Sequence, residues 1–213
     1  MAKLQSSFKN MALSLTCIAL VAAGALAGVY MLTMAPIEAA MKAKQEAAIM
    51  QVLPQVEGLQ VAEAQVFNGL TYYKAYVGEE WVGTAVEAST EGNVNMPFGG
   101  TFRLMVGFDN VGNVVNYVVL EQAETPGLGA LMVSWFCNAD KPGQNIIGKN
   151  PATTNFTVSK DGGDVDAITA STITSRAFLE VVVKAYNAIA QQPMPLEATS
   201  GATQLTTEEG GLQ

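Results

Sequence analysis

Residues 101–120, TFRLMVGFDNVGNVVNYVVL, decide the fold, because they contain two strands and the turn that joins them. The first strand alternates, and the side chains that we expect to face a hydrophobic core are Phe102, Leu104, Val106 and Phe108. Residues 109–113 supply the turn, and residues 114–120 return as a largely apolar strand. The stretch therefore predicts an antiparallel strand pair.

Similar patterns lie upstream of this pair. Residues 72–76 and 81–86 flank residues 77–80, VGEE, which predicts a hairpin. Aromatic side chains suit strand faces, so we expect core packing for Tyr72, Trp81, Phe102 and Tyr117. Helical spacing replaces alternation towards both ends of the chain. The sequence thus predicts an α+β fold in which helices pack on a twisted antiparallel sheet.

The downstream part contains a hydroxyl-rich stretch, residues 166–175, DAITASTITS. Apolar residues then recur at helical spacing, namely Phe178, Val181, Val182, Ala185 and Ile189. The hydroxyls therefore lie at a helix N-terminus, where unpaired N–H groups and the helix dipole favour a phosphate. Simple capping of the helix by these side chains is the alternative. Before this stretch we expect a short helix at 135–137, a loop at 145–156, a short strand at 157–160 and a tight turn at 161–164.

Composition excludes several classes of function. The 213 residues suffice for one ordinary domain plus accessory segments, and the net charge of −8 disfavours nucleic acid as a partner. Histidine is absent, which excludes serine–histidine triads and histidine-based zinc sites. The two cysteines, Cys17 and Cys137, cannot form a disulfide framework or a thiolate metal site within one chain. We therefore expect no metal centre.

The N-terminal region predicts a membrane anchor. No charged residue lies between Lys9 and Glu38, and residues 11–34 have about the length of a transmembrane helix. A cleaved signal peptide is the alternative, but the apolar run exceeds the usual length of its hydrophobic region. A slight lysine bias places residues 1–10 in the cytoplasm and the folded part outside. Residues 35–57 are expected to form a juxtamembrane helix and linker, with Pro36 in the first helical turn.

The remaining chain divides into a domain and a tail. We expect residues 58–192 to form the folded domain and residues 193–213, which are polar and acidic, to be a disordered tail. Within the domain, residues 121–129, EQAETPGLG, directly follow the strand pair. Their two glycines around one leucine give a backbone that a planar ligand can approach closely. An ordinary Pro-Gly turn is the alternative.

Taken together, the anchor, the strand pair, Glu121 with residues 125–129 and residues 161–177 resemble a known FMN-binding domain. This domain is shared by the G subunit of the Rnf ion-translocating electron-transport complex and the C subunit of the sodium-pumping NADH:quinone oxidoreductase. In that family a threonine closes an Asp-x-x-(Ser/Thr)-Gly-Ala-Thr motif, and a flavin transferase esterifies its hydroxyl to the FMN phosphate. Aligning Asp166 with the motif's aspartate gives Thr172 this covalent role.

Two departures from the motif and one rival match accompany this alignment. Ala170 stands where the family has glycine, and Ser171 where it has alanine. Residues 200–203, SGAT, match the four-residue core better. However, they lack the preceding aspartate and a following amphipathic helix, so the resemblance favours Thr172.

The compact chain is more similar to the Rnf G subunit. The resemblance implies a one-electron carrier, not catalytic alone, anchored in a bacterial inner membrane with its domain on the periplasmic side. Its partners would be the other subunits of the Rnf-type complex, the flavin transferase and the lipid bilayer. The implied FMN contacts, besides Thr172, are Glu121, Thr125, Gly127, Leu128 and Gly129, with Lys160, Asp166, Thr174 and Ser175 as further candidates. Two alternatives stay open: the FMN subunit of the quinone reductase, and an extracytoplasmic binding or scaffold module without flavin.

Overall fold

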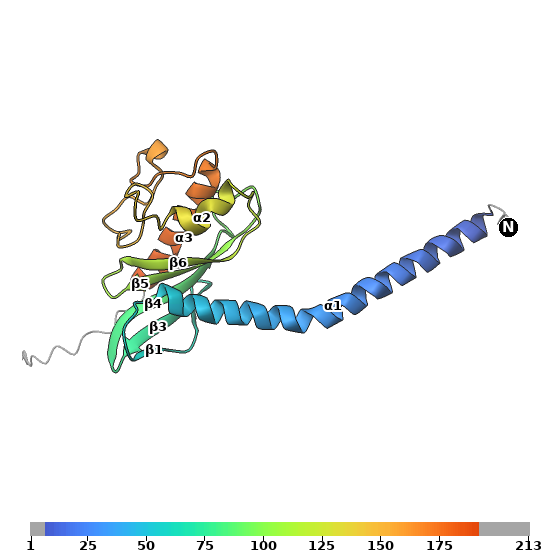
Figure 1. Cartoon of the computed structure of the whole chain (residues 1–213), viewed down its shortest axis with the longest axis horizontal. Coiled ribbons are helices and arrows are strands. Elements are labelled where there is room, and N and C mark those ends of the chain that lie inside the picture. The colour runs from blue at the N-terminus through green and yellow to red at the C-terminus, as the bar shows by residue number, and fades with distance from the viewer. Residues whose placement is uncertain (1–6, 192–213) are drawn as a thin grey trace, which may run out of the picture.

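A computed structural model describes residues 7–191, which form one long helix and an α+β domain (Figure 1). Helix α1 (Phe8–Val52) projects far from the domain and is long and apolar enough to cross a membrane. Its apolar part is exposed in the described chain, whereas residues in its last turns are buried. Charged side chains are absent from this part, so nothing opposes burial in hydrocarbon.

Pro36 lies inside α1 and does not begin a second helix, which differs from the expectation for residues 35–57. Proline removes one backbone hydrogen bond and fixes φ, so it kinks a helix when the turns on both sides of it remain helical. The surrounding alanines, methionines, lysines and glutamates are strong helix formers. They carry the helix through Pro36, and a bend is visible part of the way along α1 (Figure 1).

The sheet has six strands, all of them antiparallel to their neighbours. They are β1 (Leu59–Val61), β2 (Gln65–Phe67), β3 (Leu70–Val77), β4 (Glu80–Ser89), β5 (Arg103–Asp109) and β6 (Val114–Glu121). Their order is β1-β3-β4-β5-β6, with β2 also paired to β3. The predicted hairpin and strand pair are confirmed as β3–β4 and β5–β6. The short strands β1 and β2 were not predicted.

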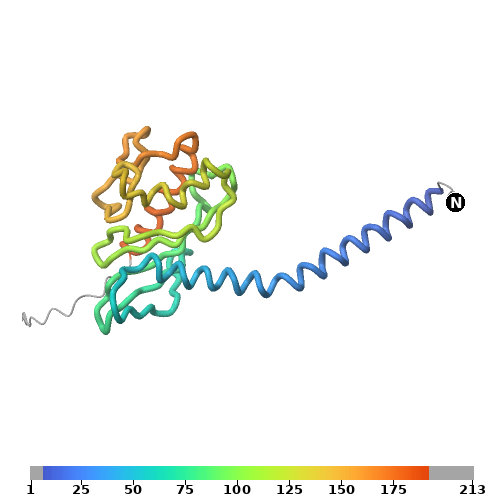
Figure 2. The backbone as a smooth tube through the Cα atoms, viewed as in Figure 1, coloured from blue at the N-terminus to red at the C-terminus, as the bar shows by residue number. Residues whose placement is uncertain are grey.

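One face of the sheet packs on helix α3 (Thr172–Ala190). Phe102 and the three alternating residues of β5, Leu104, Val106 and Phe108, face this core, as expected. Phe178 of α3 contacts both Tyr117 and Phe136. Between β6 and α3 the chain forms η1 (Gly129–Leu131), α2 (Met132–Trp135) and η2 (Ser159–Asp161). Figure 2 shows these segments gathered at one end of the domain. The strand expected at 157–160 is reduced to a single bridge between Val158 and Val165.

The opposite face is also covered, which the alternation in β5 did not predict. The last turns of α1 pack there against the sheet in a second core of Ala48, Ile49, Val52, Leu53, Ala75, Ala85, Met105 and Leu120. Gly107 permits this approach, because a Cβ atom at that position would lie 1.8 Å from the carbonyl oxygen of Val52. The α+β fold with an apolar N-terminal helix is confirmed. The proposed tail, residues 193–213, and the rival motif at 200–203 lie outside the described residues.

Candidate functional site

Thr172 is the first residue of α3 and is half-buried. Its predecessor Ser171 is the N-cap residue but makes no side-chain cap hydrogen bond. The first helical bond runs from the Ser175 amide to the Ser171 carbonyl oxygen at 3.1 Å, so the N–H groups of the first turn find no acceptor within the helix. Capping therefore does not account for this hydroxyl cluster. The amides and the helix dipole together favour an anion at the end of α3.

The other hydroxyls of the cluster bond to one another and to the backbone. Ser171 Oγ donates to Thr174 Oγ1 at 2.9 Å, and Ser175 Oγ donates to the Ser171 carbonyl oxygen at 2.9 Å. Ser175 Oγ also accepts from the Ile168 amide. Thr174 and Ser175 have no exposed surface. The structure therefore gives both residues a place beneath the helix start, where they fix the position of Thr172.

Ala170 has a φ of 59° and adopts the left-handed conformation. This conformation turns the chain from the preceding loop into the N-cap of α3. It is unfavourable for any residue with a Cβ atom and easy for glycine. Position 170, where the family that the sequence resembles has glycine, therefore has a backbone conformation that favours glycine.

Lys160 approaches Thr172 from η2. Its Nζ atom donates to Thr172 Oγ1 at 3.4 Å, and both side chains reach solvent. Asp166 supports the intervening loop, because its Oδ1 atom accepts from Ser159 Oγ at 2.7 Å and its carbonyl oxygen from the indole N–H of Trp135 at 2.9 Å. The predicted residues Lys160 and Thr172 are thus in contact, and Asp166 bonds to Ser159, the neighbour of Lys160.

Glu124 joins the glycine-rich loop to the start of α3, and sequence reasoning missed it. It is only 7% exposed, and its Oε2 atom accepts from Thr174 Oγ1 at 2.9 Å. Its Oε1 atom accepts from the amide of Gly99 at 2.7 Å. A Cβ atom at Gly129 would lie 1.9 Å from Oε2, so any larger residue there would displace this carboxylate. The signal for it in the sequence was its place directly before Thr-Pro-Gly-Leu-Gly.

The glycine-rich loop itself is a compact turn. The Thr125 carbonyl oxygen accepts from the amides of Leu128 at 3.1 Å and Ala130 at 3.3 Å. Gly127 has a φ of 77°, and a Cβ atom there would meet no other atom within 4 Å. Thr125, Gly127 and Leu128 are exposed, whereas Gly129 is buried against Glu124. The loop therefore offers an open backbone surface next to the start of α3.

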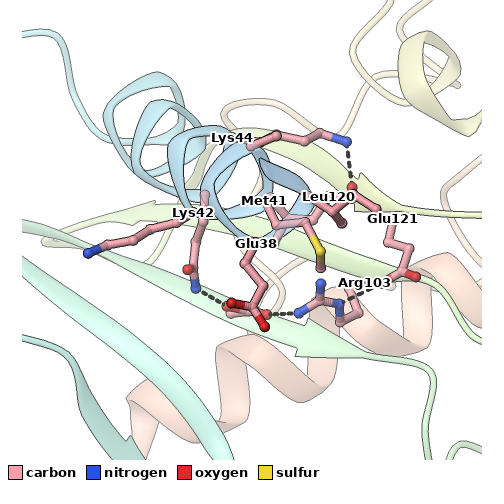
Figure 3. A pocket seen from close by; sticks show the side chains of 11 residues that line it. Glu38, Met41, Lys42, Lys44, Arg103, Leu120 and Glu121 are labelled. Carbon is pink, nitrogen blue, oxygen red and sulfur yellow. Dashed lines mark hydrogen bonds and ion pairs between the residues drawn. The ribbon is translucent and has the colours of Figure 1, made fainter. Parts of the chain in front are cut away.

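Glu121 does not join this group. It pairs with Arg103 in the β-ladder, on the face that carries Met105 and α1. There Glu121 Oε2 accepts from Arg103 Nε at 3.1 Å, and Arg103 also bonds to Glu87 at 2.7 Å. These side chains line a cavity of about 600 Å³ beneath α1 (Figure 3). Glu121 is thus separated from Thr172 by the sheet.

Three charged residues follow Thr172 along one face of α3 at four-residue spacing, and all of them are engaged. Arg176 donates two hydrogen bonds to Asp161, at 2.6 and 2.7 Å, and this pairing lowers the pKa of Asp161. Glu180 accepts from the amides of Val94 and Asn95 and from the Asn95 side chain. Burial raises the pKa of Glu180, but these hydrogen bonds outweigh it and lower the pKa overall. Lys184 donates to the carbonyl oxygens of Ser89 and Glu91.

Comparison with known proteins gives two family matches and several similar proteins. The FMN-binding domain family matches residues 98–187, and the RnfG N-terminal region matches residues 1–52. Several similar proteins are named as the G subunit of an ion-translocating oxidoreductase complex. The one from Haemophilus influenzae strain PittEE is 31% identical over 158 residues, which cover 71% of this chain and 75% of that protein. Those from Yersinia pestis and Escherichia coli K12 are 32% and 35% identical, each covering 67% of this chain and 71% of the relative.

These matches confirm the resemblance drawn from the sequence. They also separate the two related complexes, because the N-terminal match carries the RnfG name and the similar proteins are G subunits of an ion-translocating oxidoreductase complex. The matched N-terminal region includes α1, the one helix between residues 7 and 191 that could cross a membrane. The chain belongs to the RnfG family, the G subunits of ion-translocating oxidoreductase complexes, and contains an FMN-binding domain.

Proposed function

We propose that this protein is a membrane-anchored electron carrier of an Rnf-type complex and holds FMN through a phosphoester on Thr172. One observation carries the proposal: the Thr172 hydroxyl reaches solvent at the uncapped N-terminus of α3, with the Lys160 ammonium 3.4 Å away. A phosphate on this oxygen is met by one cation and by the positive end of a helix dipole. These residues therefore fit the phosphate end of FMN.

The chain's own residues have distinct tasks in attachment. The Thr172 oxygen forms a bond to the phosphorus of an activated flavin nucleotide, while the bond to the nucleotide leaving group breaks. The hydroxyl proton passes to the flavin transferase or to solvent. Lys160 and the first-turn amides offset the negative charge at phosphorus. Glu124, Thr174 and Ser175 hold the start of α3 in place.

FMN supplies electron transfer when it is bound, and the protein fixes its position and limits its exposure to water. The exposed backbone of residues 125–128 forms a surface for the isoalloxazine ring, with Gly129 buried against Glu124. Glu121 is not part of this surface, since it lies across the sheet. An ester bond suits a carrier that works outside the cytoplasm, because lost cofactor is not replaced there.

The same proposal gives the protein its place in the cell. Residues 11–34 of α1 span the bacterial inner membrane, with residues 1–10 in the cytoplasm and the FMN-binding domain on the periplasmic side. This orientation rests on the lysines before the span, since acidic residues count little in setting topology. Other subunits of the complex and the flavin transferase are its partners.

Co-expression of the full chain with a flavin transferase tests attachment. We expect a band that fluoresces under ultraviolet light on a denaturing gel, and the mass of an FMN phosphoester on the peptide that contains Thr172. Thr172→Ala should abolish both signals, while Thr203→Ala, in the rival motif, should leave them unchanged. Flavin that persists in Thr172→Ala would overturn the assignment. A chain that never acquires flavin would favour the scaffold alternative.

A further inference from the structure

The loop of residues 90–102 is closed at its base and held firmly against the domain. The amide of Thr90 donates to the Phe102 carbonyl oxygen at 3.2 Å, and the Phe102 amide donates to Thr90 Oγ1 at 3.1 Å. Despite this fixed base, the loop presents apolar side chains to solvent. Val94 is 91% exposed and Phe98 is 82% exposed. An exposed phenyl ring on a fixed loop next to the proposed FMN site is a candidate contact for the cofactor.

The loop runs along α3 towards Thr172. Lys184 holds its first part through the carbonyl oxygens of Ser89 and Glu91, at 3.3 and 2.9 Å. Glu180, one turn earlier in α3, accepts from the Val94 amide at 2.8 Å. Because Thr172 lies on the same helical face, two turns before Glu180, the loop follows this face from its C-terminal towards its N-terminal end.

The far end of the loop is fixed at the level of the first turn of α3. The Gly99 amide donates to Glu124, which accepts from Thr174 at its other oxygen. Gly99 also packs on the backbone, since a Cβ atom there would lie 2.3 Å from the Ala123 carbonyl oxygen. Phe98 therefore directly precedes Gly99, whose amide contacts Glu124 at the start of the glycine-rich loop. The same carboxylate contacts Thr174 in the first turn of α3, which begins at Thr172.

We propose that Phe98 covers one face of the isoalloxazine ring of the FMN attached to Thr172, an inference that rests on the proposed function. The ring then lies between the phenyl group and the open backbone of residues 125–128. Planar aromatic groups gain from such stacking, and the exposed apolar surface of Phe98 is removed from water. Glu124 has a positioning role, because it holds Gly99 and Thr174 at once.

The isoalloxazine ring has one alternative location, which competes with the location beside Phe98. A groove of about 360 Å³ lies further along α3, lined by Val94, Phe156, Arg176, Glu180 and their neighbours. A ring in that groove would contact Val94 and not Phe98. The two residues stand four positions apart in one loop and are both highly exposed, so they form a matched pair.

Collisional quenching by acrylamide distinguishes these locations in the full chain, flavinylated by co-expression and purified in detergent. Phe98→Ala uncovers one of the two ring faces, so the quenching constant of flavin emission should rise about twofold. Phe98→Leu should give a smaller rise, and Val94→Ala none. An unchanged constant in Phe98→Ala, or a rise in Val94→Ala, would overturn the inference. Mass spectrometry of each variant separates these outcomes from failure of the proposed function, in which the unmutated chain carries no flavin.

Discussion

The ammonium group of Lys160 lies 3.4 Å from the hydroxyl oxygen of Thr172, twelve positions further along the chain. Two local features create this approach. Gly162, with a φ of 85°, ends η2 in the left-handed conformation, and Asp166 ties the following loop to Ser159. The charge of the lysine thus falls at the proposed attachment point.

Replacing Lys160 with methionine should slow flavin incorporation about tenfold, because a charge-assisted hydrogen bond contributes about 1.5–3 kcal/mol. The rate is measured as flavin fluorescence gained over time with purified transferase. Lys160→Arg should keep most of the rate. Lys141→Met, which removes another exposed lysine, is the control. Equal rates in Lys160→Met and Lys141→Met would show that the ammonium group takes no part.

Glu124 and Glu121 stand three positions apart on opposite sides of the sheet, and their loss should destabilise the fold to different extents. Glu124→Ala leaves the Gly99 amide and the Thr174 hydroxyl without their acceptor and should lower the free energy of unfolding by about 3 kcal/mol. Glu121→Ala removes an exposed ion pair and should lower it by less than about 1 kcal/mol. Chemical unfolding of the full chain in detergent measures both. The reverse ranking would contradict the role given to Glu124.

Ala170→Gly should stabilise the protein, although it removes a methyl group. The left-handed conformation costs a residue with a Cβ atom about 1–2 kcal/mol, and the greater freedom of glycine in the unfolded chain offsets part of that gain. We expect a net gain of about 0.5–1 kcal/mol in the free energy of unfolding. Gly162→Ala makes the opposite change at a φ of 85° and should destabilise. A loss of stability in Ala170→Gly would show that the turn is not strained.

The hold of Glu180 on the 90–102 loop should weaken in acid. Hydrogen bonds from Asn95 and Val94 lower the pKa of Glu180, so its carboxylate stabilises the fold above the ordinary value of 4.5. That stabilisation is lost as the pH falls through the lowered pKa. Hydrogen exchange at the Val94 and Asn95 amides reports it as a falling protection factor. Glu180→Gln should show low protection already at pH 7, whereas Glu91→Gln, in the same loop, should titrate like the unmutated protein.

Alternation and helical spacing predicted the parts of the fold that depend on local pattern. The β5–β6 pair and the helix after residue 171 follow from the period of their apolar residues. Strands β1 and β2 have three residues each, too short for a period to be visible. Pro36 was misplaced, because the flanking helix formers outweigh one proline. The second core was missed, since the end of α1 is distant in sequence from the strands it covers.

The site divides in the same way. Residues near Thr172 in the sequence, together with Lys160 and Asp166, are brought together by one short loop and were foreseeable. Glu124 was not, because its two partners come from a β4–β5 connection and from α3, which only the folded chain unites. Glu121, a candidate on the resemblance, lies on the other face of the sheet, because the two faces separate residues that are close in sequence.

The packing of α1 through Val52 against Gly107 means that anchor and domain share one interior. Proteolysis between residues 53 and 58 would release a domain without α1. One face of its sheet would then expose Ala75, Ala85, Met105 and Leu120 to water. Such a surface invites self-association. The folded core therefore begins near Ala48, within α1, and not at the first strand.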